Sequence, residues 1–275
     1  MPRRRVTQLV ALSLLVVASL GAMFSLSKSK ISRFPYMGRE LALPEFRALG
    51  ARPGWQTRVL DLGSGVSLRG LVRPAAQAGA PFLLFFNGNS GQLLSEGQQL
   101  LDLICKDSSW GRALWAYRGF DGSSGQPNPK VLEDDALHVY QMLLEQEKLE
   151  PRSVHVVAFS LGTSIATALV SRARDRAPAS LTLLAPLTVI DLGERFQLRK
   201  DRYETLKYLS SIVSPTLVVH GAKDETLPIS GGRLVAERLG ARGRFVEMPR
   251  DGHFELLDSE PVAELVRKFV SEHSR

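Results

Sequence analysis

The sequence has little of what a disulfide-rich or zinc-stabilised fold needs. Its 275 residues contain a single cysteine, Cys105, which cannot form an internal disulfide, and only five histidines. With so few thiol and imidazole groups, no structural zinc site is expected. The chain also lacks a Gly-x-Gly-x-x-Gly fingerprint and a P-loop lysine, so no motif favours nucleotide binding. We therefore predict a protein that uses neither a metal nor a cofactor.

Acidic residues are missing from the first 33 positions, although these positions hold six lysines and arginines. Because the whole chain has a formal charge of +7, residues 34–275 carry only about +1. Nucleic-acid-binding domains concentrate basic side chains on their folded part, so this near-neutral remainder argues against a nucleic-acid partner. The composition, with 44% hydrophobic and 23% charged residues, is ordinary for a folded globular protein.

The basic residues at the N-terminus flank one long apolar run, Val6–Leu26. As a helix its 21 residues would span about 31 Å, close to the roughly 30 Å hydrocarbon core of a bilayer. We therefore expect residues 1–33 to be an uncleaved, single-pass membrane anchor. The alternatives are a cleaved signal peptide, for which Leu20-Gly21-Ala22 is a poor cleavage site, and a soluble structural helix.

A short basic leader of this kind usually exports the chain that follows it. We therefore expect an extracytoplasmic location for residues 34–275, in the periplasm if the source is bacterial, and secretion after cleavage is the alternative. The positive-inside rule leaves the orientation open, because Lys28, Lys30 and Arg33 nearly balance Arg3–Arg5.

The remainder divides into a proline- and glycine-containing connector, residues 34–54, with a short helix near Glu45–Leu49, and a regular domain, residues 55–275. In the domain, strand-like runs alternate with helical ones, and the middle strands are continuously apolar, as in parallel strands covered on both faces. This pattern predicts an α/β protein with about eight strands in one mostly parallel sheet and helices on both faces. The predicted strands are Gln56–Leu62, Val66–Val72, Phe82–Phe86, Ala113–Tyr117, Val154–Phe159, Leu181–Leu184, Thr216–His220 and Arg244–Met248. The predicted helices are Ser95–Lys106, Val131–Lys148, Thr163–Arg174, Gly231–Leu239 and Pro261–His273.

The segment Ala158–Gly162 follows a predicted strand and opens a predicted helix, with Ser160 at its centre. This is the setting of a nucleophile elbow, in which a tight turn requires small residues two positions before and after the serine. A serine that merely caps the helix is the alternative. The strand–turn–helix context favours Ser160 as the nucleophile.

Two candidate partners follow Ser160 in the order that serine hydrolases of this type require. Asp224 lies on the loop after Thr216–His220, and His253 lies on the loop after Arg244–Met248. All three residues are expected on loops at the carboxyl edge of neighbouring strands. His253 would act as the general base and acid, and Asp224 would orient its imidazole.

Other residues were weighed for the same roles. Glu225 could replace Asp224 as the acid, Asp191 follows the sixth strand and is the less suitable choice, and Asp251 is expected to be a turn residue. The remaining histidines are expected to be structural or surface residues: His138, His155, His220 and His273.

An oxyanion hole for this chemistry needs backbone donors. The amide of Leu161, directly after the nucleophile, should be one of them. The amide of Asn89, on the Gly/Asn-containing loop 86–91, should be the other, although this loop could also be a plain turn.

These motifs resemble the α/β-hydrolase superfamily, especially the small membrane-anchored serine hydrolases related to the fungal bud-emergence protein, and they are similar to prolyl-oligopeptidase catalytic domains. The resemblance covers about residues 55–272 and implies the α/β-hydrolase fold. Two positions depart from the family pattern: Asn87 stands where histidine is usual, and Ala158 where glycine is usual. The matching segments are Phe86–Ser90, Tyr117–Phe120, Gly125–Pro127, Ala158–Gly162, Asp201–Leu206, His220–Pro228 and Gly252–His253.

The expected activity is hydrolysis of a small acyl ester or lipid-derived ester through an acyl-Ser160 intermediate. A thioesterase, an acyltransferase or a peptidase would use the same triad, and a non-catalytic binding protein with the hydrolase fold is a further alternative. Segment 186–215 is long enough for a short lid only. Its apolar residues either line an acyl pocket or cover the core: Leu187, Val189, Ile190, Leu192, Phe196 and Leu198.

Membrane fractionation tests the anchor. We expect the full chain to sediment with membranes and a chain lacking residues 1–30 to remain in the supernatant, because the deletion removes the apolar run. Mass spectrometry of the full-length protein should find the N-terminal segment still attached. A shortened, secreted product would contradict the anchor and identify a cleaved signal.

Overall fold

The computed structural model describes residues 36–106, 109–188 and 203–274. The chain divides into two compact units, Met1–Tyr36 and Met37–Arg275, and the description below concerns the second. The predicted anchor lies outside the described residues. Within the ranges that are described, no helix is both long and apolar enough to cross a membrane.

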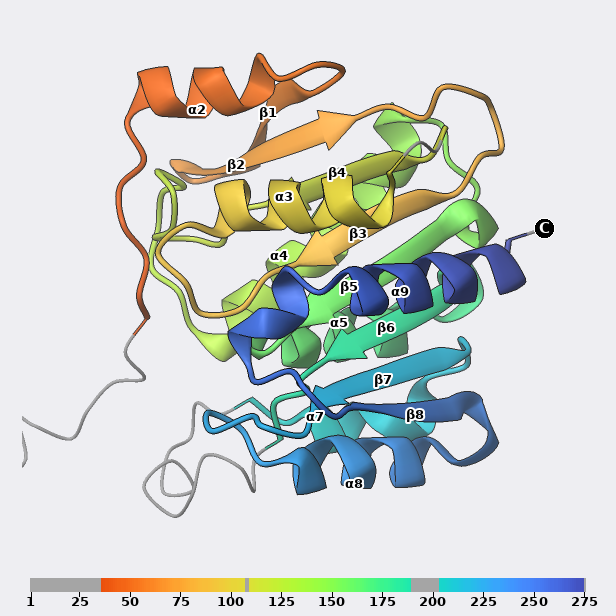
Figure 1. Ribbon diagram of the computed structural model, residues 1–275. Helices are drawn as coiled ribbons and strands as arrows, with labels where there is room; N and C mark the ends of the chain where they lie inside the picture. Colours follow the sequence, from red (N-terminus) through yellow and green to blue (C-terminus); the bar gives the residue numbers. More distant parts are fainter. Residues whose placement is uncertain (1–35, 107–108, 189–202, 275) are drawn as a thin grey trace, which may run out of the picture. The chain divides into compact units, whose positions relative to one another are not determined.

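The second unit is built on one sheet of eight strands in the order β1-β2-β4-β3-β5-β6-β7-β8 (Figure 1). Strands β1 and β2 form an antiparallel hairpin, β2 is antiparallel to β4, and all other neighbouring pairs are parallel. The predicted eight-stranded, mostly parallel sheet is therefore confirmed. The strands are β1 (Gln56–Gly63), β2 (Val66–Arg73), β3 (Phe82–Phe86), β4 (Gly111–Trp115), β5 (Val154–Phe159), β6 (Ser180–Leu184), β7 (Thr216–Gly221) and β8 (Gly243–Met248).

The central strands are mostly apolar and buried along their whole length because helices cover both of their faces. Every residue of β3, β5, β6 and β7 is buried. The outer strands β1 and β8 instead contain many exposed and half-buried residues. The core therefore lies along the middle of the sheet, directly beneath the carboxyl ends of β5 and β7.

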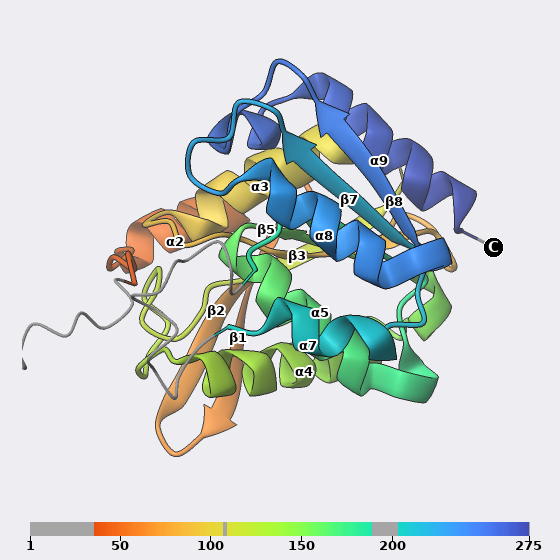
Figure 2. The same cartoon turned by 90° about the horizontal axis from the view of Figure 1, so that it is seen from below.

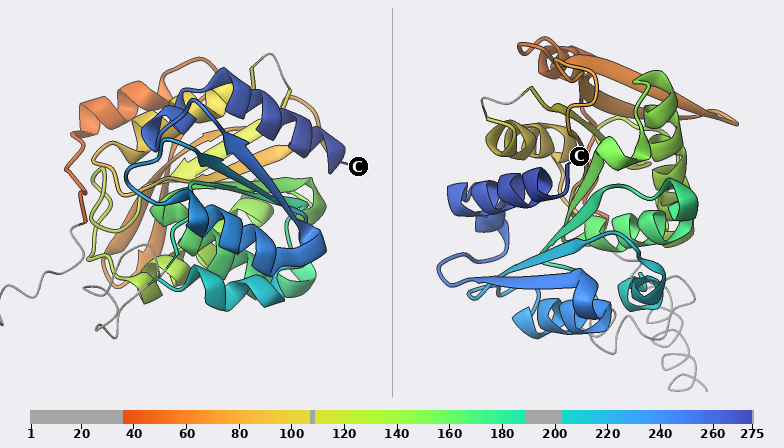
Figure 3. Two further views of the ribbon diagram at one scale, coloured as in Figure 1. Left: turned by 60° about the horizontal axis from the view of Figure 1, so that its bottom comes forward. Right: turned by 90° about the vertical axis from the view of Figure 1, so that its right-hand side faces the viewer.

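The helices occupy the two faces as right-handed crossovers require. The connections that contain α4, α5 and α8 all cross the sheet in the same direction, so these helices lie on one face (Figures 2 and 3). The connection that contains α3 crosses in the opposite direction, and α3 packs with α9 on the other face. The α-helices are α2 (Leu43–Gly50), α3 (Leu93–Ile104), α4 (Pro129–Gln146), α5 (Leu161–Ala173), α7 (Thr205–Tyr208), α8 (Ile229–Leu239) and α9 (Glu260–Glu272). Short 3-10 turns lie at Pro151–Ser153, Arg174–Arg176, Leu209–Ser211, Gly240–Arg242 and Phe254–Leu257.

The connector approaches the carboxyl edge of the sheet before it forms α2 (Figure 1). The amide of Met37 donates a hydrogen bond to Asn89 Oδ1 over 2.9 Å. A Cβ atom on Gly38 would lie 2.2 Å from the carbonyl oxygen of Gly119, so this glycine lets two backbones pass closely. The connector therefore contacts two loops that leave the carboxyl edge.

Two expectations from the sequence need adjustment. Strand β4 ends at Trp115, two residues before the predicted end, because Ala116 and Tyr117 are buried in the following loop and so continue the apolar pattern. Residues 189–202 of the segment expected to form a lid lie outside the described residues. They include most of the apolar side chains of that segment. The described part contains the short helix α7, and Leu187 is buried.

The start of α4 provides a test of local stability. Asn128 is its N-cap, with its side-chain oxygen accepting the amide of Val131 at 3.1 Å, and Pro129 occupies the first turn. We expect Asn128→Ala to lower the free energy of unfolding by about 1 kcal/mol, since the cap hydrogen bond is lost. Asn128→Asp should retain most of it. Urea titration of both variants measures the difference, and an alanine variant as stable as the parent would contradict it.

Candidate active site

The turn between β5 and α5 holds Ser160 in a backbone conformation that L-residues rarely adopt, with φ 49° and ψ −119°. Two hydrogen bonds fix this turn. The Ser160 amide donates to the carbonyl of Leu184 at the end of β6, and the Thr163 amide donates to the carbonyl of Ser160. A strained serine between a buried strand and a helix is the geometry of a nucleophile elbow.

Close packing explains the small residues on either side of the turn. A Cβ atom on Gly162 would lie 2.2 Å from the carbonyl oxygen of Phe86, so no side chain fits there. Ala158 is fully buried between β3 and β6, opposite Phe86 and Leu183. Alanine in place of the glycine usual in the family is accommodated in this turn.

The structure brings together the three residues predicted from the sequence. His253 Nε2 lies 3.0 Å from Ser160 Oγ, and His253 Nδ1 lies 2.7 Å from Asp224 Oδ2. Ser160 is half-buried, and His253 is only 5% exposed. The expectation that all three loops follow neighbouring strands was wrong in one respect, because β6 lies between β5 and β7. The loops still converge at the carboxyl edge.

Asp224 has a buried side chain that is fully provided with hydrogen-bond donors. Its Oδ1 accepts the amides of Thr226 and Leu227 at 2.8 and 2.7 Å, and its Oδ2 accepts from His253 and lies 3.1 Å from His220 Nε2. Burial raises the pKa of this carboxyl, but hydrogen bonds from His220, His253 and Leu227 outweigh burial and hold the pKa well below its usual range. The carboxylate is therefore ionised at neutral pH.

The structure assigns the alternative acids to other places. Glu225 is exposed, and Asp251 lies in the turn after β8, where its amide donates to the Met248 carbonyl. Asp191 lies outside the described residues. Burial raises the pKa of Cys105 to about 11, which leaves this thiol protonated and makes it a poor rival nucleophile.

Three of the four remaining histidines have the structural or surface positions expected. His155 Nδ1 is 2.8 Å from Ser180 Oγ, His273 Nδ1 is 2.8 Å from the Phe269 carbonyl, and His138 is exposed. The contact between His220 and Asp224 was not anticipated. Its only trace in the sequence is the spacing of four residues between a strand histidine and the acid.

The loop after β3 passes beside Ser160, since a Cβ atom on Gly88 would lie 3.2 Å from Ser160 Cβ. Asn87, in place of the usual histidine, holds this loop. Its Nδ2 donates to the Leu93 carbonyl, its Oδ1 accepts the Gly88 amide, and its carbonyl accepts the Tyr117 hydroxyl. The loop is thus well braced, and the use of the Leu161 and Asn89 amides as the oxyanion hole stays a prediction.

A second buried carboxylate bonds to the start of the helix that follows this loop. Asp121 is 1% exposed, and its Oδ2 accepts the Leu94 amide in the first turn of α3 at 2.7 Å. Its Oδ1 is buried and has no hydrogen-bond partner among the described residues. Burial raises the pKa of Asp121 to about 6, the Leu94 hydrogen bond acting in the opposite direction.

Aromatic rings form one side of the site. The ring centroids of Phe159 and His253 are 4.8 Å apart, and those of His253 and Phe254 are 5.0 Å apart. Phe254 is 62% exposed. An apolar surface therefore lies beside the imidazole of His253.

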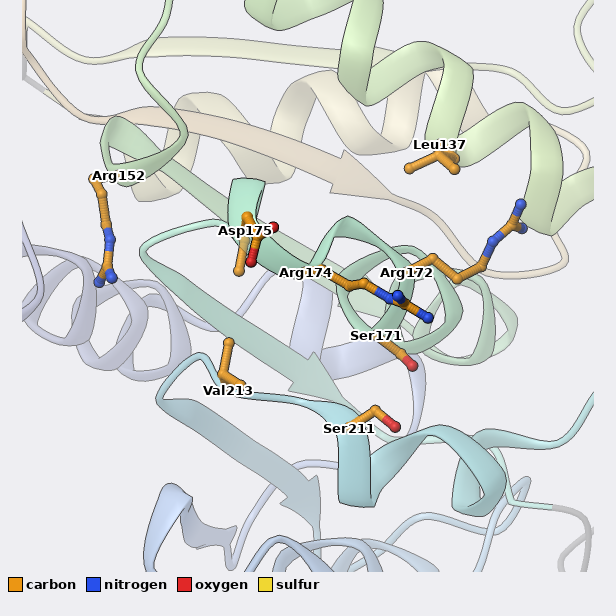
Figure 4. A pocket seen from close by; sticks show the side chains of 9 residues that line it. Leu137, Arg152, Ser171, Arg172, Arg174, Asp175, Ser211 and Val213 are labelled. Atoms are coloured by element: carbon orange, nitrogen blue, oxygen red, sulfur yellow. The ribbon is translucent and has the colours of Figure 1, made fainter.

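A pocket of about 780 Å³ lies at the amino ends of the parallel strands (Figure 4). Its lining residues Arg152 and Val213 shortly precede β5 and β7, so they are at the amino ends of these strands, away from the triad. Among the described residues, no group of three or more His, Cys, Asp or Glu side chains is placed to hold a metal ion.

Comparisons with known proteins agree with this architecture. No family model matches the chain. Over 282 residues it is 28% identical to the uncharacterized protein Rv2307c of Mycobacterium tuberculosis, an alignment that covers 98% of this chain and 96% of the relative. It is 26% identical over 198 residues to the lysophosphatidylserine lipase ABHD12 of Danio rerio, covering 62% of this chain and 51% of that protein.

Among solved structures, esterase 2 of Thermogutta terrifontis phosphorylated by paraoxon is similar, with a TM-score of 0.65 and 17% identity. The match covers 80% of this chain and 94% of the esterase. The chain therefore has the α/β-hydrolase fold, as the sequence predicted.

Asp121 gives the site a testable pH dependence. Its pKa of about 6 exceeds the ordinary 3.8, so the folded protein binds this proton more tightly and loses stability as the pH rises from about 4 to about 6. Asp121→Asn cannot ionise and should escape that loss. We expect the variant to gain up to about 3 kcal/mol on the parent between pH 4 and pH 7.5.

Urea unfolding at both pH values measures this relative gain. Any cost of the buried amide itself cancels in the comparison, because that cost does not change with pH. A stability difference between parent and variant that is the same at pH 4 and pH 7.5 would contradict the prediction.

Proposed function

We propose that this chain is a serine hydrolase that cleaves a carboxylic ester through an acyl-Ser160 intermediate. One observation carries the proposal: a continuous line of contacts from Asp224 Oδ2 through both ring nitrogens of His253 to Ser160 Oγ, with distances of 2.7 and 3.0 Å. Within the superfamily, we infer a place near the small membrane-anchored serine hydrolases that the sequence motifs resemble.

The first half of the reaction forms the acyl-enzyme. His253 Nε2 takes the proton of Ser160 Oγ as this oxygen attacks the ester carbonyl. The amides of Leu161 and Asn89 stabilise the negative charge that develops on the carbonyl oxygen. The tetrahedral intermediate then collapses, and His253 gives the proton to the departing alcohol.

The second half regenerates the enzyme. Water attacks the acyl carbonyl while His253 takes its proton, and the return of that proton to Ser160 Oγ releases the carboxylic acid. Throughout, ionised Asp224 holds the Nδ1–H tautomer of His253 and stabilises the imidazolium that forms twice in each cycle. The low pKa of Asp224 keeps its charge available at every working pH.

We infer an ester with an apolar acyl group, and a lipid-derived ester in particular. Exposed Phe254 beside His253 offers the acyl chain an apolar surface, and Met37, 61% exposed, donates its amide to Asn89 on the loop beside Ser160. The name of the Danio rerio relative, a lysophosphatidylserine lipase, supports the same substrate class. The near-neutral domain gives no basis for a nucleic-acid partner.

The location follows from the first 33 residues. We propose that they anchor the protein in a membrane, with the catalytic domain on the extracytoplasmic side. Met37 comes four residues after this segment and contacts the loop beside the nucleophile.

Labelling with a fluorophosphonate probe tests the nucleophile. We expect rapid labelling of the parent and a loss of at least about a thousandfold in Ser160→Ala, because the probe reacts only with an activated serine. Ser164→Ala is the matched control. Ser164 lies in the next turn of α5, fully buried, and its hydroxyl has no hydrogen-bond partner among the described residues, so its loss should leave labelling unchanged.

Two results would contradict the proposal. Labelling that persists in Ser160→Ala would exclude this serine as the nucleophile. A parent that folds normally but is not labelled would favour a non-catalytic protein with the hydrolase fold.

Hydrolysis of p-nitrophenyl butyrate and of its thioester analogue, compared in the labelled and unlabelled protein, then separates esterase from thioesterase activity.

A further inference from the structure

His220 is a fully buried histidine near the end of β7, four residues before the acid of the triad. Its Nε2 lies 3.0 Å from the carbonyl oxygen of Leu227 and 3.1 Å from Asp224 Oδ2. Both of these oxygens are acceptors. His220 Nε2 must therefore carry the proton, which it shares between the two oxygens.

The other ring nitrogen fixes the charge of the side chain. Nδ1 is buried and has no hydrogen-bond partner among the described residues. Helix α8 packs against it, since a Cβ atom on Gly232 would lie 2.6 Å from Nδ1. A proton at this nitrogen would be buried without an acceptor, which is costly, so His220 is the neutral Nε2–H tautomer.

Asp224 Oδ2 consequently receives N–H groups from two imidazoles, at 2.7 Å from His253 and 3.1 Å from His220. The two rings lie on different elements, one in β7 and one on the loop after β8. The same His220 proton also ties the Leu227 carbonyl, at the far end of the acid's own loop. The carboxylate is thus oriented by a group that never approaches the nucleophile.

We propose that His220 is a positioning residue of the triad, which orients Asp224 by an Nε2–H shared with the Leu227 carbonyl so that the carboxylate faces His253 Nδ1. The inference rests on the proposed function and extends it to a fourth side chain. His220 itself touches no substrate. Its effect should fall on the chemical step, with binding of the ester left unchanged.

Three variants test this role. We expect His220→Leu to lower kcat for p-nitrophenyl butyrate, and the rate of fluorophosphonate labelling, by about tenfold or more, with KM within about twofold of the parent. His220→Gln, whose amide can donate to the same two oxygens, should recover much of the loss. His155→Leu is the matched control, because His155 is equally buried in β5 but bonds to Ser180 and Ser274 instead.

A second perturbation leaves the histidine in place. Gly232→Ala puts a methyl group against His220 Nδ1 and should displace the ring from Asp224 while favouring the helix. We expect kcat to fall in this variant too, again with KM little changed. It tests the proposal even if His220→Leu fails to fold.

A folded His220→Leu or Gly232→Ala with the parent's kcat would overturn the inference, as would equal losses in His155→Leu. Proton NMR keeps this test separate from the proposed function. The low-field resonance of the His253 Nδ1 proton, held by Asp224, should appear in the parent and in His155→Leu and weaken or shift in His220→Leu. This difference between the variants is expected whether or not the parent reacts with the fluorophosphonate probe. An unchanged resonance in His220→Leu would also overturn the inference.

Discussion

The arrangement of the site depends on one buried charge, the carboxylate of Asp224. An ionised carboxylate is expensive to bury unless donors surround it, and here two loop amides and two imidazoles supply them. Each donor carries a geometric consequence. The amides of Thr226 and Leu227 set the shape of the loop after β7, and the contact with His253 Nδ1 turns Nε2 toward Ser160. Satisfying one charge therefore fixes the shape of the Asp224 loop, the tautomer of His253 and the direction in which its Nε2 points.

The sheet makes this arrangement possible because it delivers three distant segments to a single edge. Ser160 follows β5, a strand buried on both faces, and its strained turn is held by the Leu184 carbonyl of the adjacent strand. The same crowding excludes a side chain at Gly162, where helix α5 meets the backbone of β3. Ser160 is thus oriented by the packing of the core, and the strain in its backbone is balanced by hydrogen bonds and burial from three strands.

Much of this was predictable from sequence, and the exceptions have physical reasons. The strands Phe82–Phe86 and Val154–Phe159 were located to the residue, because each is a mostly apolar run, interrupted only by His155 in the second, that ends at a polar turn residue. The predicted end of strand β4 was two residues too late. Tyr117 is buried in the following loop, where its hydroxyl donates to the Asn87 carbonyl, and an apolar pattern cannot distinguish a strand from a buried loop. Strand order is not encoded locally, so the position of β6 between β5 and β7 could not be anticipated. The contact between His220 and Asp224 was missed for a similar reason. It depends on the fold of the loop after β7, which brings Asp224 back beside His220.

The loop after β3 shows how a departure from a family pattern can be compensated. Asn87 uses its amide nitrogen, amide oxygen and carbonyl to tie this loop to α3, to Gly88 and to Tyr117, so an asparagine can brace the loop in place of the usual histidine. The connector adds a further constraint, because the Met37 amide is bonded to the side chain of Asn89. The residue proposed to complete the oxyanion hole is therefore held on one side by the core and on the other by the segment that leads from the N-terminus.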